Sequence, residues 1–384
     1  MAVSGFGFAT LALIVVIGMA GPLIASVGRF GIPAVIGELA AGIAFGSSGL
    51  RIVDHTDPVF TLLADIGFAL VMFVAGTHVP VRDASLRTAL PAAAVRAVLA
   101  GLGAAVLAVV LAQVFGTGHA LLYAVLMASS SAALALPVID SLGLTGPPVL
   151  SVTAQIAIAD TAAIVLLPLA IAPSQAGRAS LGVLAVFGCA AVVYGLLRVA
   201  DRRGWRRRAH RFTERYRVAL ELRVSLMLLF ALCALAVTTR ISIMLAGFAL
   251  GLVVAAVGQP RRLARQLFGV TEGFFGPLFF VWLGASLNIG ALGTNPKLIA
   301  LGVALGLGAV LAHTAGRMLG QPVPLAVLSA AQLGVPVAAA TLGSDRKILT
   351  AGEPAALILG ALVTVVAAAV AAAVLRRRQQ AAPT

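Results

Sequence analysis

"AQIAIADTAAIVLLP" (residues 154–168) sets one aspartate, Asp160, in the middle of an otherwise apolar segment. The rest of this segment has the composition of a helix that lies in lipid. An ionised carboxylate at the centre of a membrane helix costs roughly 2.5 to 3.5 kcal/mol on insertion scales, so such a residue is usually kept for a function. Asp160 is therefore the first candidate for a functional residue.

The composition of the whole chain is that of an integral membrane protein. Hydrophobic residues make up 61% of the 384 residues, charged residues make up 10%, and the mean hydropathy is +1.08. These values exclude an ordinary soluble domain. The net charge of +14 comes from Lys and Arg in short gaps between apolar runs, so we expect no nucleic-acid partner. Cys189 and Cys233 fall inside apolar runs, which favours small core residues over a disulfide or a metal pair, and we expect no cofactor.

The apolar runs predict an all-α polytopic protein with about thirteen transmembrane helices, since about 20 apolar residues span a bilayer core. The first run has no basic segment before it, which argues against a cleaved signal peptide. The predicted spans are 5–27, 32–46, 58–78, 88–115, 118–139, 148–172, 179–200, 218–238, 241–258, 267–288, 293–316, 322–343 and 354–375.

The basic residues predict how the chain is oriented in the membrane. With the N-terminus outside and the C-terminus in the cytoplasm, most Lys and Arg fall on the cytoplasmic side, including the runs in 201–217, 261–265 and 376–378. This asymmetry is the positive-inside pattern. We therefore expect a multi-pass protein of the cell membrane, whose basic runs need no partner beyond water and anionic lipid heads.

Two motifs recur at nearly equal offsets and predict a duplication. "AGIAFG" (41–46) recurs as "AGFALG" (246–251), and "LVMFVAGTHV" (70–79) recurs more weakly as "LFFVWLGASL" (278–287). Within a transmembrane domain of residues 1–375, followed by a short cytoplasmic tail (376–384), the offsets predict two six-helix repeats of inverted topology. The repeats cover about 5–172 and 218–375, joined by a linker helix (179–200) and a basic loop (201–217).

An inverted repeat predicts an ion or substrate site near the membrane midplane, formed by two broken helices. "ASSSAALALP" (128–137) and "AAQLGVPVAA" (330–339) combine Ser, Gly and Pro inside apolar runs at matching places in the two halves. Unwound carbonyls there can bind a cation, and the hydroxyls can complete its shell. The candidate ligands beside Asp160 are Ser129, Ser130, Ser131 and, more weakly, Gln332. The alternative is that these small residues only allow close helix packing.

Several segments together resemble one known family, the monovalent cation:proton antiporters, and most closely the branch with the Kef-type potassium and bacterial sodium antiporters. The matching segments cover roughly residues 30 to 375 in the family's order. They are "IGELAAGIAFGSSGL" (36–50), "LADIGFALVMFVAG" (63–76), "SSSAALALPVIDSLGL" (129–144), "GPLFFVWLGASLNI" (276–289) and "AAQLGVPVAAATLG" (330–343).

The resemblance implies that Asp160 is the shared carrier of cation and proton, because the family has an aspartate in the sixth of thirteen helices. Three positions depart from the family. Ala159 stands where relatives usually have Asp, Asn or Gln; His313 stands where many have a lysine; and His78 stands where many have a glutamate. The first two changes are consistent with each other, because an unpartnered ammonium at this depth is costly.

The remaining buried ionisable residues each have two readings. Glu38 and Asp65 line the ion path in one reading and make a structural hydrogen bond to a neighbouring helix in the other. His313 and His78 are able to tune activity with pH, or they are neutral core histidines with satisfied hydrogen bonds.

The expected function is the exchange of Na⁺ or K⁺ for H⁺ by alternating access, with one carboxylate, Asp160, as the site that binds either the metal ion or the proton. One titrating carboxylate implies electroneutral exchange. The family implies a homodimer. Six residues follow the terminal arginines, so we expect no Kef-type cytosolic nucleotide-binding domain.

Two alternative activities remain open at this level, besides a purely structural or receptor role. One is a sodium-coupled transporter of another solute with the same fold. The other is an intramembrane serine hydrolase, because "GSSG" (46–49) matches the pattern of such enzymes and His78 or His119 is available as a base. Thirteen helices and a duplicated architecture argue against the hydrolase.

Overall fold

The computed structural model describes residues 7–27, 34–79, 81–82, 84–171, 173, 176–204, 219–239, 241–258 and 261–381. All regular structure in these ranges is helical, and no strand occurs in them, which confirms the all-α class. The basic loop predicted at 201–217 lies outside the described ranges from position 205 onward, as do the last three residues of the tail.

Contacts within the chain divide it into two compact units. Unit 1 comprises Met1–Thr61, Asp83–Pro173 and Phe280–Thr384, and unit 2 comprises Leu62–Arg82 and Ser174–Phe279. Each unit therefore draws on both halves of the sequence.

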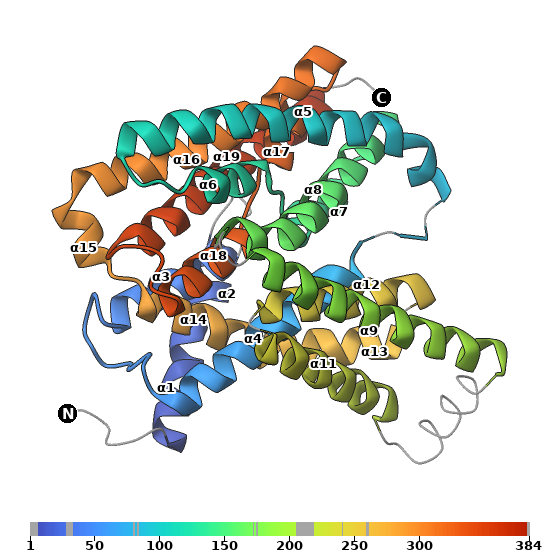
Figure 1. Cartoon of the computed structure of the whole chain (residues 1–384), viewed down its shortest axis with the longest axis horizontal. Helices are drawn as coiled ribbons and strands as arrows, with labels where there is room; N and C mark the ends of the chain where they lie inside the picture. The colour runs from blue at the N-terminus through green and yellow to red at the C-terminus, as the bar shows by residue number, and fades with distance from the viewer. Residues whose placement is uncertain are drawn as a thin grey trace. The chain divides into compact units, whose positions relative to one another are not determined.

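The helices of unit 1 carry most of the candidate residues (Figure 1). They are α1 (Phe8–Gly18), α2 (Ala20–Val27), α3 (Ala34–Phe45), α5 (Ala84–Phe115), α6 (Ala120–Ala128), α7 (Ala132–Ser141), α8 (Pro147–Ile171), α15 (Ile289–Thr294), α16 (Pro296–Thr314), the 3₁₀ turn η3 (Ala315–Leu319), α17 (Val323–Ser329), α18 (Gly334–Asp345) and α19 (Glu353–Ala381). Within this unit α16 packs against α5 and α19, and α5 packs against α6 and α8.

Unit 2 is built around three long helices that pack against one another. Its elements are α9 (Ala176–Arg202), α11 (Leu220–Thr238), α12 (Ile243–Val257), α13 (Arg261–Val270) and the π-helical turn η2 (Thr271–Phe275). Two further helices, α4 (Pro58–Thr77) and α14 (Gly276–Ser286), have residues in both units.

Every one of the thirteen predicted spans coincides with helix. Among the described residues nine helices are long and apolar enough to cross a membrane: Pro58–Thr77, Thr88–Phe115, Pro147–Ile171, Ala176–Arg202, Leu220–Thr238, Leu263–Ser286, Pro296–Leu319, Val323–Asp345 and Glu353–Arg378. The other four predicted spans are shorter apolar segments, Phe8–Leu23, Ala34–Phe45, Ala120–Leu136 and Ile243–Val257. A protein that crosses the membrane many times is thus supported, and the number of crossings stays a prediction.

The outer side of α5 shows how such helices meet lipid. Val98, Leu102, Val106 and Val114 are 62 to 70% exposed, although all four are apolar. In a bilayer this exposure costs nothing, because backbone groups are paired within the helix and lipid tails are as apolar as these side chains.

Glycines allow α3 and α14 to approach backbone to backbone in unit 1. A Cβ on Gly42 would lie 2.3 Å from the carbonyl oxygen of Val281, and a Cβ on Gly284 would lie 2.2 Å from that of Leu39. No real Cβ tolerates such distances. Small residues at a helix interface permit this contact, and they are the usual device of packing in membranes.

The same reciprocal pattern recurs between α4 and α12 in unit 2. A Cβ on Gly76 would lie 2.5 Å from the carbonyl oxygen of Phe248, and one on Gly251 would lie 2.3 Å from that of Phe73. Gly42 and Gly251 therefore occupy corresponding places in the two contacts. The AGIAFG motif instead aligns Gly42 with Gly247, which is four residues, or about one helical turn, earlier. An exchange of partners of this kind is what an inverted repeat predicts, and the repeat itself stays a prediction.

Candidate functional site

Both predicted helix breaks are present in unit 1. The first helix ends at Ala128 and resumes at Ala132, and the second ends at Ser329 and resumes at Gly334. Pro336 falls in the first turn of α18, where a missing N–H removes no helical hydrogen bond. Each break leaves backbone N–H and C=O groups without partners inside the helix, so they are available to side chains or to a ligand.

Asp160 lies in the middle of α8 and reaches the first break. It is 6% exposed, and its Oδ2 accepts a hydrogen bond from the N–H of Ala132, 2.9 Å away, at the first residue of α7. The N-terminus of a helix presents unpaired donors and a positive partial charge, which suits a carboxylate. The aspartate and the broken helix are thereby joined.

The three serines of the first break are buried, and each of them makes a hydrogen bond. The hydroxyl of Ser129 donates to the carbonyl of Leu126 (2.8 Å), within the end of α6. The hydroxyl of Ser130 donates to the carbonyl of Ser329 (2.6 Å) and so links the two breaks. The carbonyl of Ser131 accepts N–H bonds from the first turn of α7.

His313, fully buried on α16, also belongs to this network. Its Nδ1 lies 3.1 Å from the hydroxyl oxygen of Ser329, whose own proton goes to the carbonyl of Ala326. The imidazole is therefore the donor in the contact with Ser329. Its Nε2 is buried and has no hydrogen-bond partner among the described residues.

Gln332 lies in the second break and is buried. Its backbone N–H donates to the hydroxyl oxygen of Thr364 on α19 (3.1 Å), and its side-chain Nε2 is buried without a partner among the described residues. Thr364 was not among the residues predicted from the sequence, although it follows Asp160 by nearly the same offset that separates the repeated motifs.

The remaining candidates lie outside this network. Glu38 is buried on α3, where Gly21 leaves room for its side chain. Asp65 and His78 belong to unit 2 and are exposed; the Nδ1 of His78 is 2.9 Å from the carbonyl oxygen of Val74. The structure thus gathers Asp160, the serines, Gln332 and His313, and it does not gather the other three.

A second polar cluster that the sequence analysis missed anchors the first half of α8. Gln321 donates from Nε2 to Oε1 of Gln155 (2.9 Å), and both residues are buried. Arg96 of α5 donates to the hydroxyl of Ser151 (2.6 Å) and to the carbonyl of Leu319 (3.0 Å). These contacts tie the helix that carries Asp160 to α5 and to the turn before α17.

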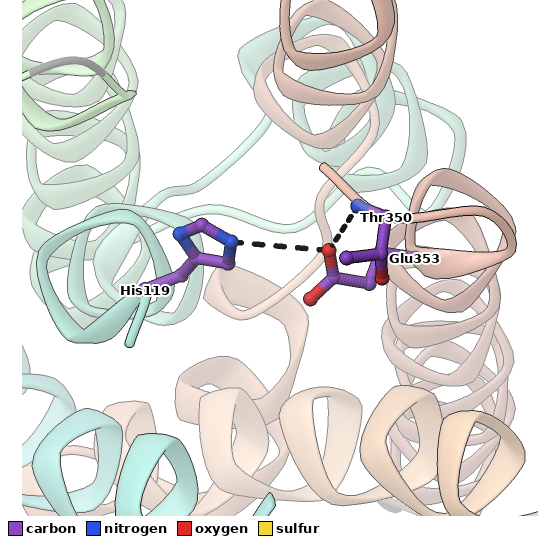
Figure 2. Close-up of polar contacts among 3 residues, drawn as sticks. All are labelled: His119, Thr350 and Glu353. Carbon is purple, nitrogen blue, oxygen red and sulfur yellow. Dashed lines mark hydrogen bonds and ion pairs between the residues drawn. The ribbon is translucent and has the colours of Figure 1, made fainter. Parts of the chain in front are cut away.

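A contact joins His119, the residue before α6, to Glu353, the first residue of α19, as Figure 2 shows. Nε2 of His119 lies 3.8 Å from Oε2 of Glu353, and the same oxygen accepts the N–H of Thr350. Both helices lead into the site, because α6 runs to the first break and α19 carries Thr364.

A cavity of about 390 Å³ lies near the start of α19. Its polar lining includes His55, Trp282, Asn288, Asp345 and Lys347. The indole N–H of Trp282 donates to the carbonyl of His55 (2.9 Å). Burial lowers the pKa of His55 below its usual value, and the nearby charge of Asp54 partly opposes this shift.

The serines of the GSSG motif have structural partners. Ser47 donates to the carbonyl of Ala285 (2.8 Å), and Ser48 donates to that of Leu287 (2.6 Å) and accepts the N–H of Ile289. These bonds fasten the end of α3 to the end of α14 and give no support to a nucleophilic serine.

Comparisons with known proteins agree with this architecture. The sequence model of a family described as "Sodium/hydrogen exchanger, transmembrane" matches residues 11–377. A protein named "Putative Na(+)/H(+) antiporter YjbQ", from Bacillus subtilis (strain 168), is 23% identical over 389 residues, covering 92% of this chain. The chain spans 61% of the length of YjbQ.

A solved structure with a similar fold is the sodium proton antiporter MjNhaP1 from Methanocaldococcus jannaschii at pH 8. It superposes with a TM-score of 0.65, covering 97% of this chain and 99% of that one, at 17% identity. At this level of identity the likeness concerns the fold.

Proposed function

Because the chain belongs to the sodium/hydrogen exchanger family, we propose that it exchanges a monovalent cation, Na⁺ or K⁺, for a proton across the membrane. Asp160 binds either ion, one at a time. This is transport without a covalent step, so the protein is not proposed to be an enzyme.

The observation that carries the proposal is the contact between a buried carboxylate and a helix break. Asp160 is buried in the middle of a membrane-length helix, and its oxygen meets the start of α7 directly after the unwound residues 129–131. A carboxylate so placed is costly unless it has a function. Beside it lie the backbone groups of an unwound segment, which are the kind of group that coordinates cations in transporters with broken helices.

The neighbouring hydroxyls suit a cation as well. Ser129 and Ser130 both donate their protons to carbonyl oxygens, so what each hydroxyl can still offer is an oxygen lone pair. Oxygen lone pairs are the ligands of alkali cations. Deprotonated Asp160 then binds the cation together with these oxygens and the carbonyls of the breaks, with Ser131 and Gln332 as further candidates, and protonated Asp160 returns without it.

Alternating access is proposed to move the helices of spans 4–6 and 11–13 as one body. Residues 88–172 and 293–375, which contain these spans, all fall in unit 1, which supports their moving together. The N-terminus is proposed to lie outside and the C-terminus in the cytoplasm, and two copies are proposed to form a homodimer.

Proteoliposomes with an internal pH dye test the proposal. NaCl, KCl, LiCl and choline chloride are added outside in turn, and we expect proton movement with at least one of the first two and none with choline. Proton movement in none of the alkali salts would contradict the proposal, and sodium-driven uptake of another solute without proton movement would favour the alternative transporter.

A further inference from the structure

Each helix break is held by a polar side chain from a long helix that follows it in sequence. At the first break the N–H of Ala132 donates to the carboxylate of Asp160, 28 residues later. At the second break the N–H of Gln332 donates to the hydroxyl of Thr364, 32 residues later. The two arrangements are alike, because in each a backbone N–H in or next to a break donates to a side chain on a neighbouring helix.

The two acceptors also correspond in the predicted duplication. Thr364 follows Asp160 by 204 positions, and AGFALG follows AGIAFG by 205. The predicted repeats pair the sixth span with the thirteenth, which contain α8 and α19. Thr364 therefore occupies in the second half the place that Asp160 occupies in the first.

Thr364 is fixed as an acceptor by its own surroundings. Its side chain is fully buried, and its hydroxyl proton goes to the carbonyl of Ala361 (2.7 Å), one turn earlier in α19. The oxygen then has lone pairs for the Gln332 N–H. That N–H lies in a buried, non-helical segment, where the loss of its acceptor carries a full desolvation penalty.

A continuous set of contacts joins Thr364 to Asp160 within unit 1. The second break begins after Ser329, whose carbonyl accepts the hydroxyl of Ser130. Ser130 lies two residues before Ala132, which donates to Asp160. A shift of the second break is therefore transmitted to the first break through Ser130.

We propose that Thr364 is a positioning residue for ion binding, the counterpart of Asp160 that holds the second break without exchanging a proton. The inference rests on the proposed function. Thr364 keeps the second break, and through Ser130 the first, in the geometry that the cation needs. A hydroxyl in this place adds no charge and no proton to the cycle, which agrees with transport by a single carboxylate.

The test compares variants of the full-length protein in the proteoliposome assay, with the rate of cation-driven proton movement measured against cation concentration. Thr364→Val keeps the shape and removes the acceptor, and we expect the half-saturating cation concentration to rise roughly tenfold, with a smaller change in the maximal rate. Thr364→Ser keeps the hydroxyl and should restore nearly the original value. Thr238→Val is the matched control, because Thr238 also donates to a carbonyl three residues earlier but is exposed on α11.

A second pair of variants guards against poor folding of Thr364→Val. Thr364→Ser and Thr364→Ala both lose the methyl group and differ only in the hydroxyl, so a higher half-saturating concentration in the alanine variant supports the inference. Equal values in these two variants, or an unchanged value in a folded Thr364→Val protein, would overturn it. An original protein that moves no protons in any alkali salt is a different result, because it overturns the proposed function itself.

Discussion

At the scale of single residues, the proposal concentrates the chemistry on Asp160. Its carboxylate is the one acidic group in the network of the two breaks as the described residues show it, and Ala159 precedes it where a second acid would otherwise stand. Serines, a glutamine amide, a threonine and an imidazole surround the breaks. These groups can orient an ion, but the carboxylate is the group that can alternate between a proton and a cation.

Asp160→Asn is expected to abolish exchange and leave the fold intact. Asparagine has nearly the same size and keeps an oxygen for the Ala132 N–H, but it cannot release and regain a proton. Cation-driven proton flux is the measurement, and thermal unfolding of the purified variant checks the fold. Asp54→Asn, in the exposed loop before α4, serves as the control and should transport normally. Substantial flux in a well-folded Asp160→Asn protein would move the carrier to another acid, with Glu38 and Asp65 next in line.

At the scale of the elements, the start of α6 and the start of α19 both depend on contacts between helices. Nε2 of His119 lies 3.8 Å from Oε2 of Glu353, and the same carboxylate oxygen accepts the N–H of Thr350. The side chain of Glu353 therefore holds the loop before α19 and contacts the residue before α6.

Glu353→Ala is expected to lower the melting temperature, because the Thr350 N–H loses its acceptor and the contact with His119 is removed. The loss of such a hydrogen bond costs about 1 kcal/mol or more. Glu353→Gln is the matched control, since glutamine keeps an oxygen for the Thr350 N–H and should lose less. Thermal unfolding of the purified variants is the measurement, and a Glu353→Ala protein as stable as the original would contradict this assignment.

The helix contacts made by glycine are tested in the same way. Gly284→Ala is expected to lower the melting temperature clearly, because its Cβ would lie 2.2 Å from the Leu39 carbonyl oxygen and would push α14 away from α3. Gly101→Ala on α5 is the matched control, since its Cβ would meet nothing within 4 Å. That variant should be neutral or stabilised by up to about 1 kcal/mol, because alanine favours the helix. A Gly284→Ala protein as stable as Gly101→Ala would show that α3 and α14 separate easily.

At the scale of the whole molecule, the charge moved in one transport cycle follows from the number of titrating groups. One carboxylate carries either one proton or one monovalent cation, so the exchange is expected to be electroneutral. His313 is the group able to change this result, because its Nδ1 donates to Ser329 and its Nε2, buried without a partner in the described part of the chain, therefore carries no proton in the neutral ring and can accept one.

Initial rates of Na⁺/H⁺ exchange are therefore expected to be the same with and without a membrane potential. The measurement imposes an inside-negative potassium diffusion potential with valinomycin and compares it with liposomes clamped at zero potential. A rate that changes several-fold with voltage would refute one-for-one exchange. Loss of that voltage dependence in His313→Gln would then identify the histidine as the additional proton carrier.

Much of this architecture is readable from the sequence because it depends on local properties. Hydropathy alone marks all thirteen apolar segments, since burial of about 20 apolar residues in lipid requires no particular partner. The breaks at 129–131 and 330–333 were predicted from Ser, Gly and Pro, which are unfavourable in the interior of a helix. Asp160 is also recognisable from the sequence, because it is the one charged residue in the apolar segment 154–168.

The partners of these groups were decided only by the tertiary structure. Thr364 as the acceptor for Gln332, Ser130 as the link between the breaks, Gln321 against Gln155 and His119 beside Glu353 all join residues far apart in the chain. Hydropathy and spacing describe one helix at a time and do not tell which faces meet. That choice depends on how the helices rotate and pack, because a buried polar atom must find a partner on whichever neighbour the packing brings within about 3 Å.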